Sequence, residues 1–170
     1  MRKILFLACL FLTLSCNNMG SKKTKVIFLG DSITQQGADL DIGFISLLKN
    51  NLNQSDFELV GKGISGNKIS DLLVRYETDV LDLNPDLVFI YIGINDVWHK
   101  YDFGTGSDID IYEKGLREII SDISSSGSRI VLCTPTVIGE NTGDFELGNK
   151  FKDVETCLLY TSDAADDLRC

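Results

Sequence analysis

The amino-acid sequence predicts an α/β protein built on a parallel β-sheet, and two patterns indicate it. Short apolar runs of strand length alternate with segments of helical period through residues 25–133. The run at residues 86–92 is apolar at nearly every position, as expected of a strand that is covered by helices on both faces. Strands that alternate with helices imply right-handed crossovers, and these place the strands parallel to one another.

Four strands and three helices are expected in alternating order. The predicted strands are residues 25–29, 57–60, 86–92 and 129–133. The predicted helices are residues 42–52, 69–83 and 108–123, each with apolar residues recurring on one face. Asn84 and Pro85 form a stop signal after the second helix, and residues 124–127 form a turn after the third.

The composition suggests an ordinary globular domain with an acidic body. The chain has 170 residues, 44% of them hydrophobic, and a formal net charge of -9. All five basic residues before Val26 lie in a stretch without acids, so the remainder carries 11 basic against 25 acidic residues, a balance of -14. Such a body has no electrostatic footprint for nucleic acid and suits a small neutral or weakly charged substrate.

The first residues indicate export. Arg2 and Lys3 precede an apolar run at residues 4–14, which is too short to span a bilayer comfortably. Residues 12–16 (LTLSC) resemble a loose bacterial lipobox, in which Cys16 becomes the lipidated first residue of the mature protein. We therefore expect a signal peptide at residues 1–16, a polar tether at residues 17–25 and an exported lipoprotein on the periplasmic or outer cell surface. A plain secretory signal cut nearby is the alternative.

The last residues do not continue the pattern of the domain. Residues 157–166 (CLLYTSDAAD) match, residue for residue, the translation of a widely used transposase sequencing adapter. We expect residues 157–170 to be an artefactual tail and residues 26–156 to be an incomplete domain. The codons of the source DNA test this, because an unrelated codon set would contradict it.

Cysteine use argues against a disulfide framework or a zinc site. Cys9 and Cys16 belong to the export segment, and Cys157 and Cys170 belong to the adapter-like tail. Only Cys133 remains, in an apolar strand-like run, where a buried and inert thiol is expected.

Three polar motifs follow three of the predicted strands. They are residues 30–34 (GDSIT), residues 63–67 (GISGN) and residues 93–96 (GIND). The carboxyl ends of parallel strands meet at one sheet edge, where α/β enzymes hold their ligands. A structural turn explains any one motif alone, but three at the same edge indicate one composite site.

The three motifs resemble, in order and spacing, the first three sequence blocks of the SGNH (GDSL-type) hydrolase family. The resemblance covers about residues 25–135. It implies a three-layer α/β/α sandwich of flavodoxin-like type and the hydrolysis of esters or thioesters by a serine, with no metal and no cofactor.

The resemblance also assigns roles to three residues. Ser32 matches the nucleophile, and its backbone N–H can serve as one oxyanion donor. Gly66 and Asn95 match the other two donors, through a backbone N–H and a side-chain amide. Loss of one such donor typically costs roughly 3–4 kcal/mol of transition-state stabilisation. The structural alternatives are a turn leading into a helix for Gly66 and an Asx-turn for Asn95.

Other residues near the motifs receive lesser roles. We expect Asp31 to shape the nucleophile loop by hydrogen bonding and Asp96 to order its own loop. Asn67 is a candidate for lining the substrate pocket. Trp98, His99 and Tyr101 follow the third motif and could form an aromatic wall for a sugar or acyl group, although surface packing explains them equally well.

The family's catalytic Asp and His have no counterpart in this chain. The family carries them a few residues apart on a last loop before a C-terminal helix. The one histidine, His99, directly follows the third motif and does not occupy that position. We therefore expect the C-terminal strand, the Asp/His loop and the last helix to be missing, and the polypeptide as written to be inactive.

The sequence thus predicts a serine esterase, recorded as a fragment, that acts on a small acyl ester, with an O-acetylated carbohydrate as one substrate class. Lysophospholipid or thioester hydrolysis is the alternative within enzymes. A catalytically silent binding module on the cell surface is the alternative outside them. Contiguous genomic DNA that continues into a segment carrying Asp and His would favour the enzyme.

Overall fold

The computed structural model describes residues 22–135. The predicted signal peptide with Cys16, most of the tether, the adapter-like tail and the predicted loss of a last strand and helix all concern residues outside this range. The described part contains the three motifs and every predicted strand and helix.

The described residues form four strands and five α-helices. The strands are β1 (Thr24–Gly30), β2 (Phe57–Gly63), β3 (Leu87–Tyr91) and β4 (Arg129–Leu132). The α-helices are α1 (Ser32–Asp39), α2 (Phe44–Asn51), α3 (Ile69–Asp79), α4 (Ile94–Asp102) and α5 (Ile109–Ser125), and a short 3-10 helix, η1 (Leu81–Leu83), follows α3.

The strands form one parallel sheet in the order β2-β1-β3-β4. The chain therefore builds outward from β1, first to one side with β2 and then to the other with β3 and β4. This confirms the predicted parallel sheet. The point at which the strand order reverses lies at β1, between β2 and β3, which is where open α/β sheets bind their ligands.

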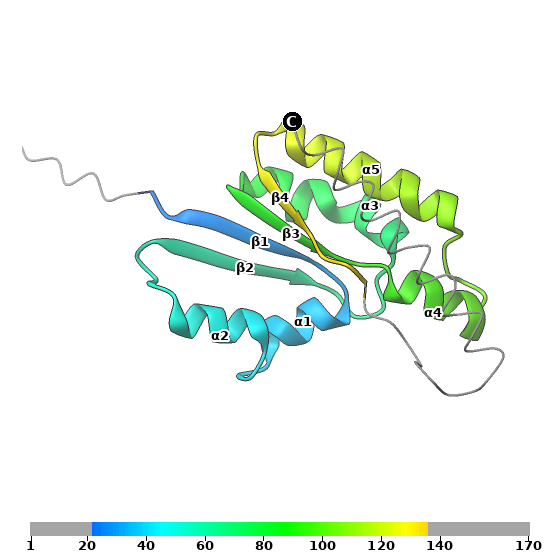
Figure 1. Cartoon of the computed structure of the whole chain (residues 1–170), viewed down its shortest axis with the longest axis horizontal. Helices are drawn as coiled ribbons and strands as arrows, with labels where there is room; N and C mark the ends of the chain where they lie inside the picture. The colour runs from blue at the N-terminus through cyan, green and yellow to red at the C-terminus, as the bar shows by residue number, and fades with distance from the viewer. Residues whose placement is uncertain (1–21, 136–170) are drawn as a thin grey trace, which may run out of the picture.

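Helices cover the sheet on both faces, and β1 shows how its residues serve the two layers (Figure 1). Ile27 and Leu29 belong to a large apolar cluster that includes residues of α3 and α5, such as Leu72 and Ile119. The alternate residues Val26 and Phe28 pack in a smaller cluster with Ile45 of α2 and with Ala38 of α1. Successive side chains of a strand point to opposite faces, so the predicted three-layer α/β/α sandwich is confirmed.

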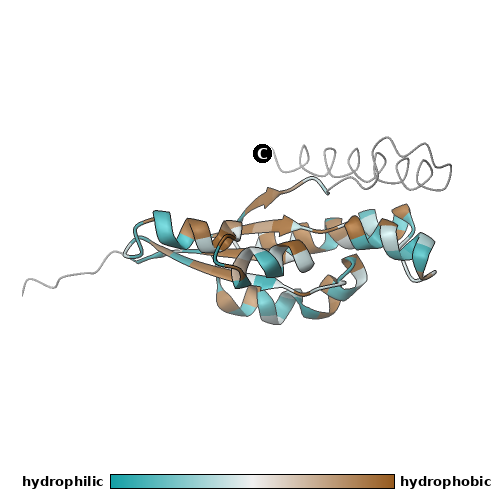
Figure 2. Ribbon diagram, turned by 90° about the horizontal axis from the view of Figure 1, so that it is seen from below, coloured by the Kyte–Doolittle hydropathy of each residue, from teal (hydrophilic) through white to brown (hydrophobic). Residues whose placement is uncertain are grey.

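The hydropathy of the elements agrees with this arrangement. In Figure 2 the strands are mostly hydrophobic, whereas the helices carry both hydrophilic and hydrophobic residues. Helix α5 illustrates the pattern, because its buried residues Tyr112, Leu116, Ile119 and Ile123 recur at helical spacing. Within residues 22–135, no helix has the length and apolar character needed to cross a membrane.

Two helices were missed by the sequence analysis, and both begin at the functional motifs. Helix α1 starts at Ser32, and its buried residues are Thr34 and Gly37. Helix α4 starts at Ile94 and buries Asn95, Asp96 and Val97. Because their buried faces are largely polar or small, neither helix shows the apolar period on which the prediction relied.

Two element boundaries differ from the predictions by three residues or more. Strand β2 continues to Gly63, three residues beyond the predicted end at Val60. The predicted helix 69–83 is divided, because α3 ends at Asp79 and η1 follows. Asn84, the residue after η1, adopts a left-handed conformation with φ 48°, which fits the stop predicted there.

Candidate active site

The register of the sheet brings the three motifs to one edge. Gly30, the last residue of β1, pairs with Gly63 of β2 on one side and with Tyr91 of β3 on the other. Ser32, Gly66 and Asn95 follow these three positions by a few residues each. The parallel sheet therefore brings the three motifs to adjacent strand ends.

Ser32 is the first residue of α1, and Asp31 caps that helix. The Asp31 carboxylate accepts a hydrogen bond from the N–H of Ile33 at 2.9 Å, which satisfies one of the exposed donors of the first turn. Asp31 is only 2% exposed, and burial raises the pKa of its carboxyl group although the Ile33 bond opposes this. Asp31 thus shapes the turn that carries Ser32, as the sequence analysis expected.

Strand β2 approaches α1 so closely that only glycine fits at position 63. A Cβ atom there would lie 2.1 Å from the backbone nitrogen of Gln35 and 2.7 Å from the carbonyl oxygen of Asp31. Backbone atoms cannot rotate away as a side chain can. The first glycine of the second motif therefore sets how near the loop after β2 lies to Ser32.

The loop after β2 is bonded to the segment that contains Ser32. The N–H of Ile64 donates to the carbonyl of Gly30 at 3.2 Å, and the N–H of Ser65 donates to the Gln35 side chain at 2.8 Å. Gly66 follows with φ +79°, a conformation that favours glycine. Gly66 thus forms a turn shortly before α3, and it has no side chain that could cover its backbone N–H.

Asn95 joins the third motif to the second. Its side chain is buried, with 2% exposure, and its amide nitrogen donates to the carbonyl oxygen of Asn67 at 3.0 Å. A side-chain amide has two N–H groups, and this bond uses one of them. Asn95, the predicted oxyanion residue at the start of α4, is therefore held directly against the loop that contains Gly66.

Asp96 contacts the start of α3 in addition to the loop after α4. Its carboxylate oxygens accept from the N–H of Ile69, at 3.1 and 3.2 Å, at the start of α3. The side chain of Ser107 also bonds to it, and its backbone carbonyl accepts from the Ser107 N–H. Asp96 thus connects α4 to α3 as well as ordering the loop after α4. Burial raises the pKa of Asp96 to about 6.

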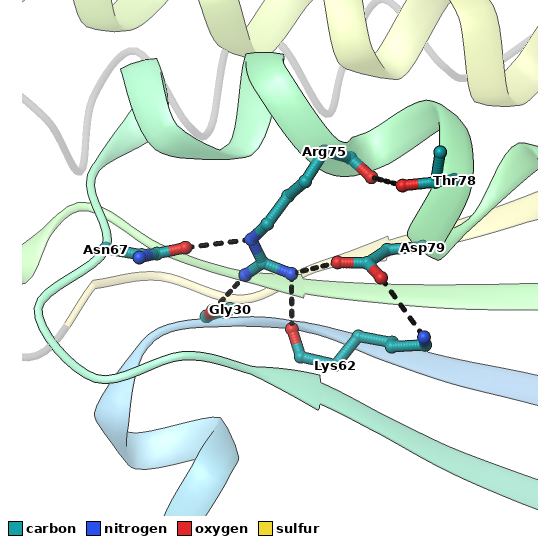
Figure 3. A network of polar contacts seen from close by, with 6 residues as sticks. All are labelled: Gly30, Lys62, Asn67, Arg75, Thr78 and Asp79. Atoms are coloured by element: carbon teal, nitrogen blue, oxygen red, sulfur yellow. Dashed lines mark hydrogen bonds and ion pairs between the residues drawn. The ribbon is translucent and has the colours of Figure 1, made fainter.

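A network around Arg75 of α3 lies beside the same strand ends (Figure 3). The guanidinium donates to the carbonyls of Gly30 and Lys62 at 2.8 and 3.0 Å, and to the Asn67 side chain at 2.8 Å. Asp79 accepts from it at 2.5 Å. The sequence analysis missed Arg75, because an arginine within a helical period carries no signal of what it contacts.

The residues predicted to bind substrate make different contacts. His99 lies beside Gly66, with its Cε1 atom 3.8 Å from the position that a Cβ of Gly66 would occupy, and its ring meets that of Phe103 edge to face at 5.2 Å. Trp98 is 43% exposed and bonds through its indole N–H to Asp102. Asn67 turns its side-chain oxygen to Arg75.

The acidic, cysteine and histidine residues of the described part do not converge as metal ligands would. Among residues 22–135, no group of three or more His, Cys, Asp or Glu side chains is placed to hold a metal ion. The candidate site consists of a hydroxyl, main-chain N–H groups and amides, which are the parts that acyl transfer by a serine uses.

Comparison with known proteins places this geometry in a family. The sequence model of the GDSL-like Lipase/Acylhydrolase family matches residues 28–154. An acetylxylan esterase of Geobacillus stearothermophilus is 36% identical over 138 residues, which cover 71% of this chain and 63% of that protein. An uncharacterized lipoprotein of Bacillus subtilis is 28% identical over 151 residues, 85% of this chain and 60% of that one. The chain thus spans about three fifths of the length of these two relatives.

Solved structures agree with the sequence comparison. The acetyl xylan esterase AlAXEase is 41% identical with a TM-score of 0.76, covering 86% of this chain and 74% of that one. A catalytic mutant of the Geobacillus acetylxylan esterase, altered at a serine, is 30% identical with a TM-score of 0.74, covering 88% and 75%. Further catalytic mutants of that esterase are altered at an aspartate and at a histidine.

The raised pKa of Asp96 predicts how stability varies with pH. An unfolded Asp titrates near pH 3.9, roughly two units below the folded value. The folded state therefore binds the proton more tightly, and the native protein loses stability relative to Asp96→Asn as pH rises from about 4 to about 6. Above about pH 6 the difference in unfolding free energy between the two proteins reaches its full value of about 2–3 kcal/mol. Urea unfolding of both proteins across this range measures it, and a constant difference would contradict the raised pKa.

Proposed function

The chain belongs to the GDSL-like lipase/acylhydrolase family, and from this premise we propose that the protein is a serine esterase that hydrolyses acyl esters. The proposal rests on one observation above all. The buried amide of Asn95 is bonded to the loop that holds Gly66, at the strand end next to the one that carries Ser32. A nucleophile and two further oxyanion donors therefore come from three adjacent loops.

The reaction follows from these parts. The Ser32 hydroxyl attacks the ester carbonyl carbon, and a base takes its proton. The carbonyl oxygen becomes an oxyanion, which accepts hydrogen bonds from the N–H groups of Ser32 and Gly66 and from the Asn95 amide. The alcohol leaves with a proton, and water then hydrolyses the acyl-serine.

The base belongs to a part of the protein that the described residues do not contain. We propose an Asp and a His, as the resemblance implies. The catalytic mutants of the Geobacillus esterase at an aspartate and a histidine support this choice. We assign His99 to substrate contact and not to the role of the base. It lies beside Gly66, on the side of the site where oxyanion donors are needed.

Within ester hydrolysis, we propose an acetylated carbohydrate as the substrate. Two relatives with this fold are acetylxylan esterases. The exposed rings of Trp98 and Tyr101 on α4, with His99 beside Gly66, offer apolar faces on which a sugar ring can stack. Asn67 lies in the same loop as Gly66 and contributes to the wall of the pocket through its backbone, because its side-chain oxygen bonds to Arg75.

Removal of the nucleophile tests the enzyme proposal. In the protein encoded by the complete gene, Ser32→Ala should lower kcat for nitrophenyl acetate by at least about 10³-fold, because no other group can form the acyl intermediate. Circular dichroism of the variant serves as the control for folding. Turnover at the wild-type level in Ser32→Ala would exclude Ser32 as the nucleophile.

The oxyanion role of Asn95 gives a second, graded result. Asn95→Ala removes one donor and should lower kcat by about 10²–10³-fold with a nearly unchanged KM, because the donor acts mainly on charge that develops in the transition state. Steady-state kinetics on the same ester separates the two constants. A rise in KM at constant kcat would assign Asn95 to substrate binding instead.

Substrate class is tested by acyl length and by the alcohol. We expect kcat/KM for nitrophenyl acetate to exceed that for nitrophenyl octanoate by about tenfold or more, and acetate to be released from acetylated xylooligosaccharides. Gas chromatography of released acetate measures the second reaction. Faster hydrolysis of the long-chain ester or of a lysophospholipid would favour the lipase alternative, and no hydrolysis of any of these by the complete protein would favour the binding module.

We further propose that Cys16 carries a lipid that anchors the protein outside the cytoplasm. The apolar run before Cys16 supports this, and so does the similarity to a Bacillus subtilis protein named as a lipoprotein. Wild-type protein expressed in bacteria should incorporate radiolabelled palmitate, and Cys16→Ser should not. Equal labelling of the two proteins, or none of the wild type, would rule out lipidation at Cys16.

A further inference from the structure

We infer that Arg75 is the positioning residue of this site, whose guanidinium sets the spacing of the segments that carry Ser32, Gly66 and Asn95. The inference rests on the proposed esterase function and assigns a role to a side chain that touches no reacting atom. Arg75 lies on α3, behind the loops, and its side chain is 13% exposed.

Three bonds of the guanidinium end on segments that lead to candidate catalytic groups, and Figure 3 shows these bonds. The carbonyl of Gly30, 2.8 Å from Nη2, is two residues before Ser32. The side-chain oxygen of Asn67, 2.8 Å from Nε, belongs to the residue directly after Gly66. The carbonyl of Lys62, 3.0 Å from Nη1, holds the end of β2 from which that loop departs. One planar group therefore fixes the nucleophile segment against the oxyanion loop.

Asn67 links Arg75 to Asn95, the third oxyanion donor. The side chain of Asn67 accepts from Arg75, while its backbone carbonyl accepts from the Asn95 amide at 3.0 Å. The orientation of the Asn95 amide thus depends on a peptide group whose own residue is held by Arg75. The carbonyl of Gly30 is likewise shared, because it also accepts from the N–H of Ile64 at 3.2 Å.

The chemistry of the contacts requires a guanidinium. Arginine presents five N–H groups in a fixed plane, so it can reach acceptors in several directions at once, whereas the single nitrogen of lysine cannot. Asp79 balances the charge, with one oxygen 2.5 Å from Arg75 and the other 3.1 Å from Lys62. Burial opposes ionisation of Asp79, but the hydrogen bonds from Arg75 and Lys62 outweigh it and lower its pKa.

A positioning role has a kinetic signature that a stabilising role lacks. Oxyanion donors must lie within a few tenths of an ångström of their productive positions, and misplacement by about 1 Å can cost 10²-fold in rate. Substrate binding in the ground state depends much less on this spacing. Loss of the Arg75 contacts should therefore lower kcat and leave KM nearly constant.

The experiment compares Arg75→Lys with Tyr76→Phe in the protein encoded by the complete gene. Tyr76 is the next residue of α3, and its hydroxyl donates to Asp122 at 2.6 Å, away from the loops. We expect Arg75→Lys to lower kcat for nitrophenyl acetate by about 10–100-fold with KM within about twofold. Tyr76→Phe should lower the midpoint of urea unfolding and leave kcat unchanged.

Asn67→Ala provides a second variant that keeps the charge pair of Arg75 and Asp79 intact, so the test remains decisive if Arg75→Lys does not fold. Asn67→Ala should also lower kcat at nearly constant KM. The fold-decrease in kcat of the double variant Arg75→Lys/Asn67→Ala should be smaller than the product of the two single fold-decreases. Guanidinium added to Arg75→Ala should restore part of kcat, and ammonium at the same concentration should not.

Two results would overturn the inference. One is a kcat unchanged in Arg75→Lys or, if that variant does not fold, in Asn67→Ala. The other is a loss that appears in KM. The result with Ser32→Ala separates this failure from failure of the esterase proposal. If Ser32→Ala is inactive while the Arg75 and Asn67 variants turn over normally, only the positioning role is wrong. If Ser32→Ala is active, the assignment of the nucleophile is wrong as well.

Discussion

The guanidinium of Arg75 is the constraint on which the arrangement of the sheet edge depends. Two carbonyl groups near the strand ends, those of Gly30 and Lys62, accept hydrogen bonds from one side chain of the covering helix α3. The same group holds the side chain of Asn67. Because a planar donor with fixed angles makes these bonds, the ends of β1 and β2 and the loop between β2 and α3 have little freedom to move apart.

The interior at this edge of the sheet is polar. Helices α1 and α4 begin directly at the motifs, and they bury Thr34, Asn95 and Asp96 where an ordinary helix would bury leucine or isoleucine. Burial of a carboxyl group such as Asp96 opposes folding at neutral pH, as its raised pKa shows. The large apolar cluster between the sheet and helices α3 and α5 stabilises the fold and offsets the cost of these buried polar side chains.

The sequence predicted the scaffold better than the contacts within the site. Apolar runs such as residues 86–92 have a physical period, so the parallel strands and the helices with apolar faces could be placed. The motifs located the edge, since the carboxyl ends of parallel strands must meet. Helices α1 and α4 were not predicted because their buried faces are largely polar or small. The role of Arg75 was not predicted because two of its partners are backbone carbonyls, which leave no trace in the pattern of side chains. Asn67 illustrates the same limit: it was expected in the pocket wall, while its side-chain oxygen bonds to Arg75.

The central claim is that three loops at adjacent strand ends activate one serine, and covalent labelling tests it most directly. The protein encoded by the complete gene is treated with a fluorophosphonate, whose tetrahedral adduct needs both a nucleophilic serine and oxyanion donors. After digestion, mass spectrometry identifies the modified residue. A single adduct on Ser32, formed together with loss of esterase activity, is the expected result. Inactivation with the adduct on another residue, or full activity with Ser32 modified, would contradict the assignment of this site.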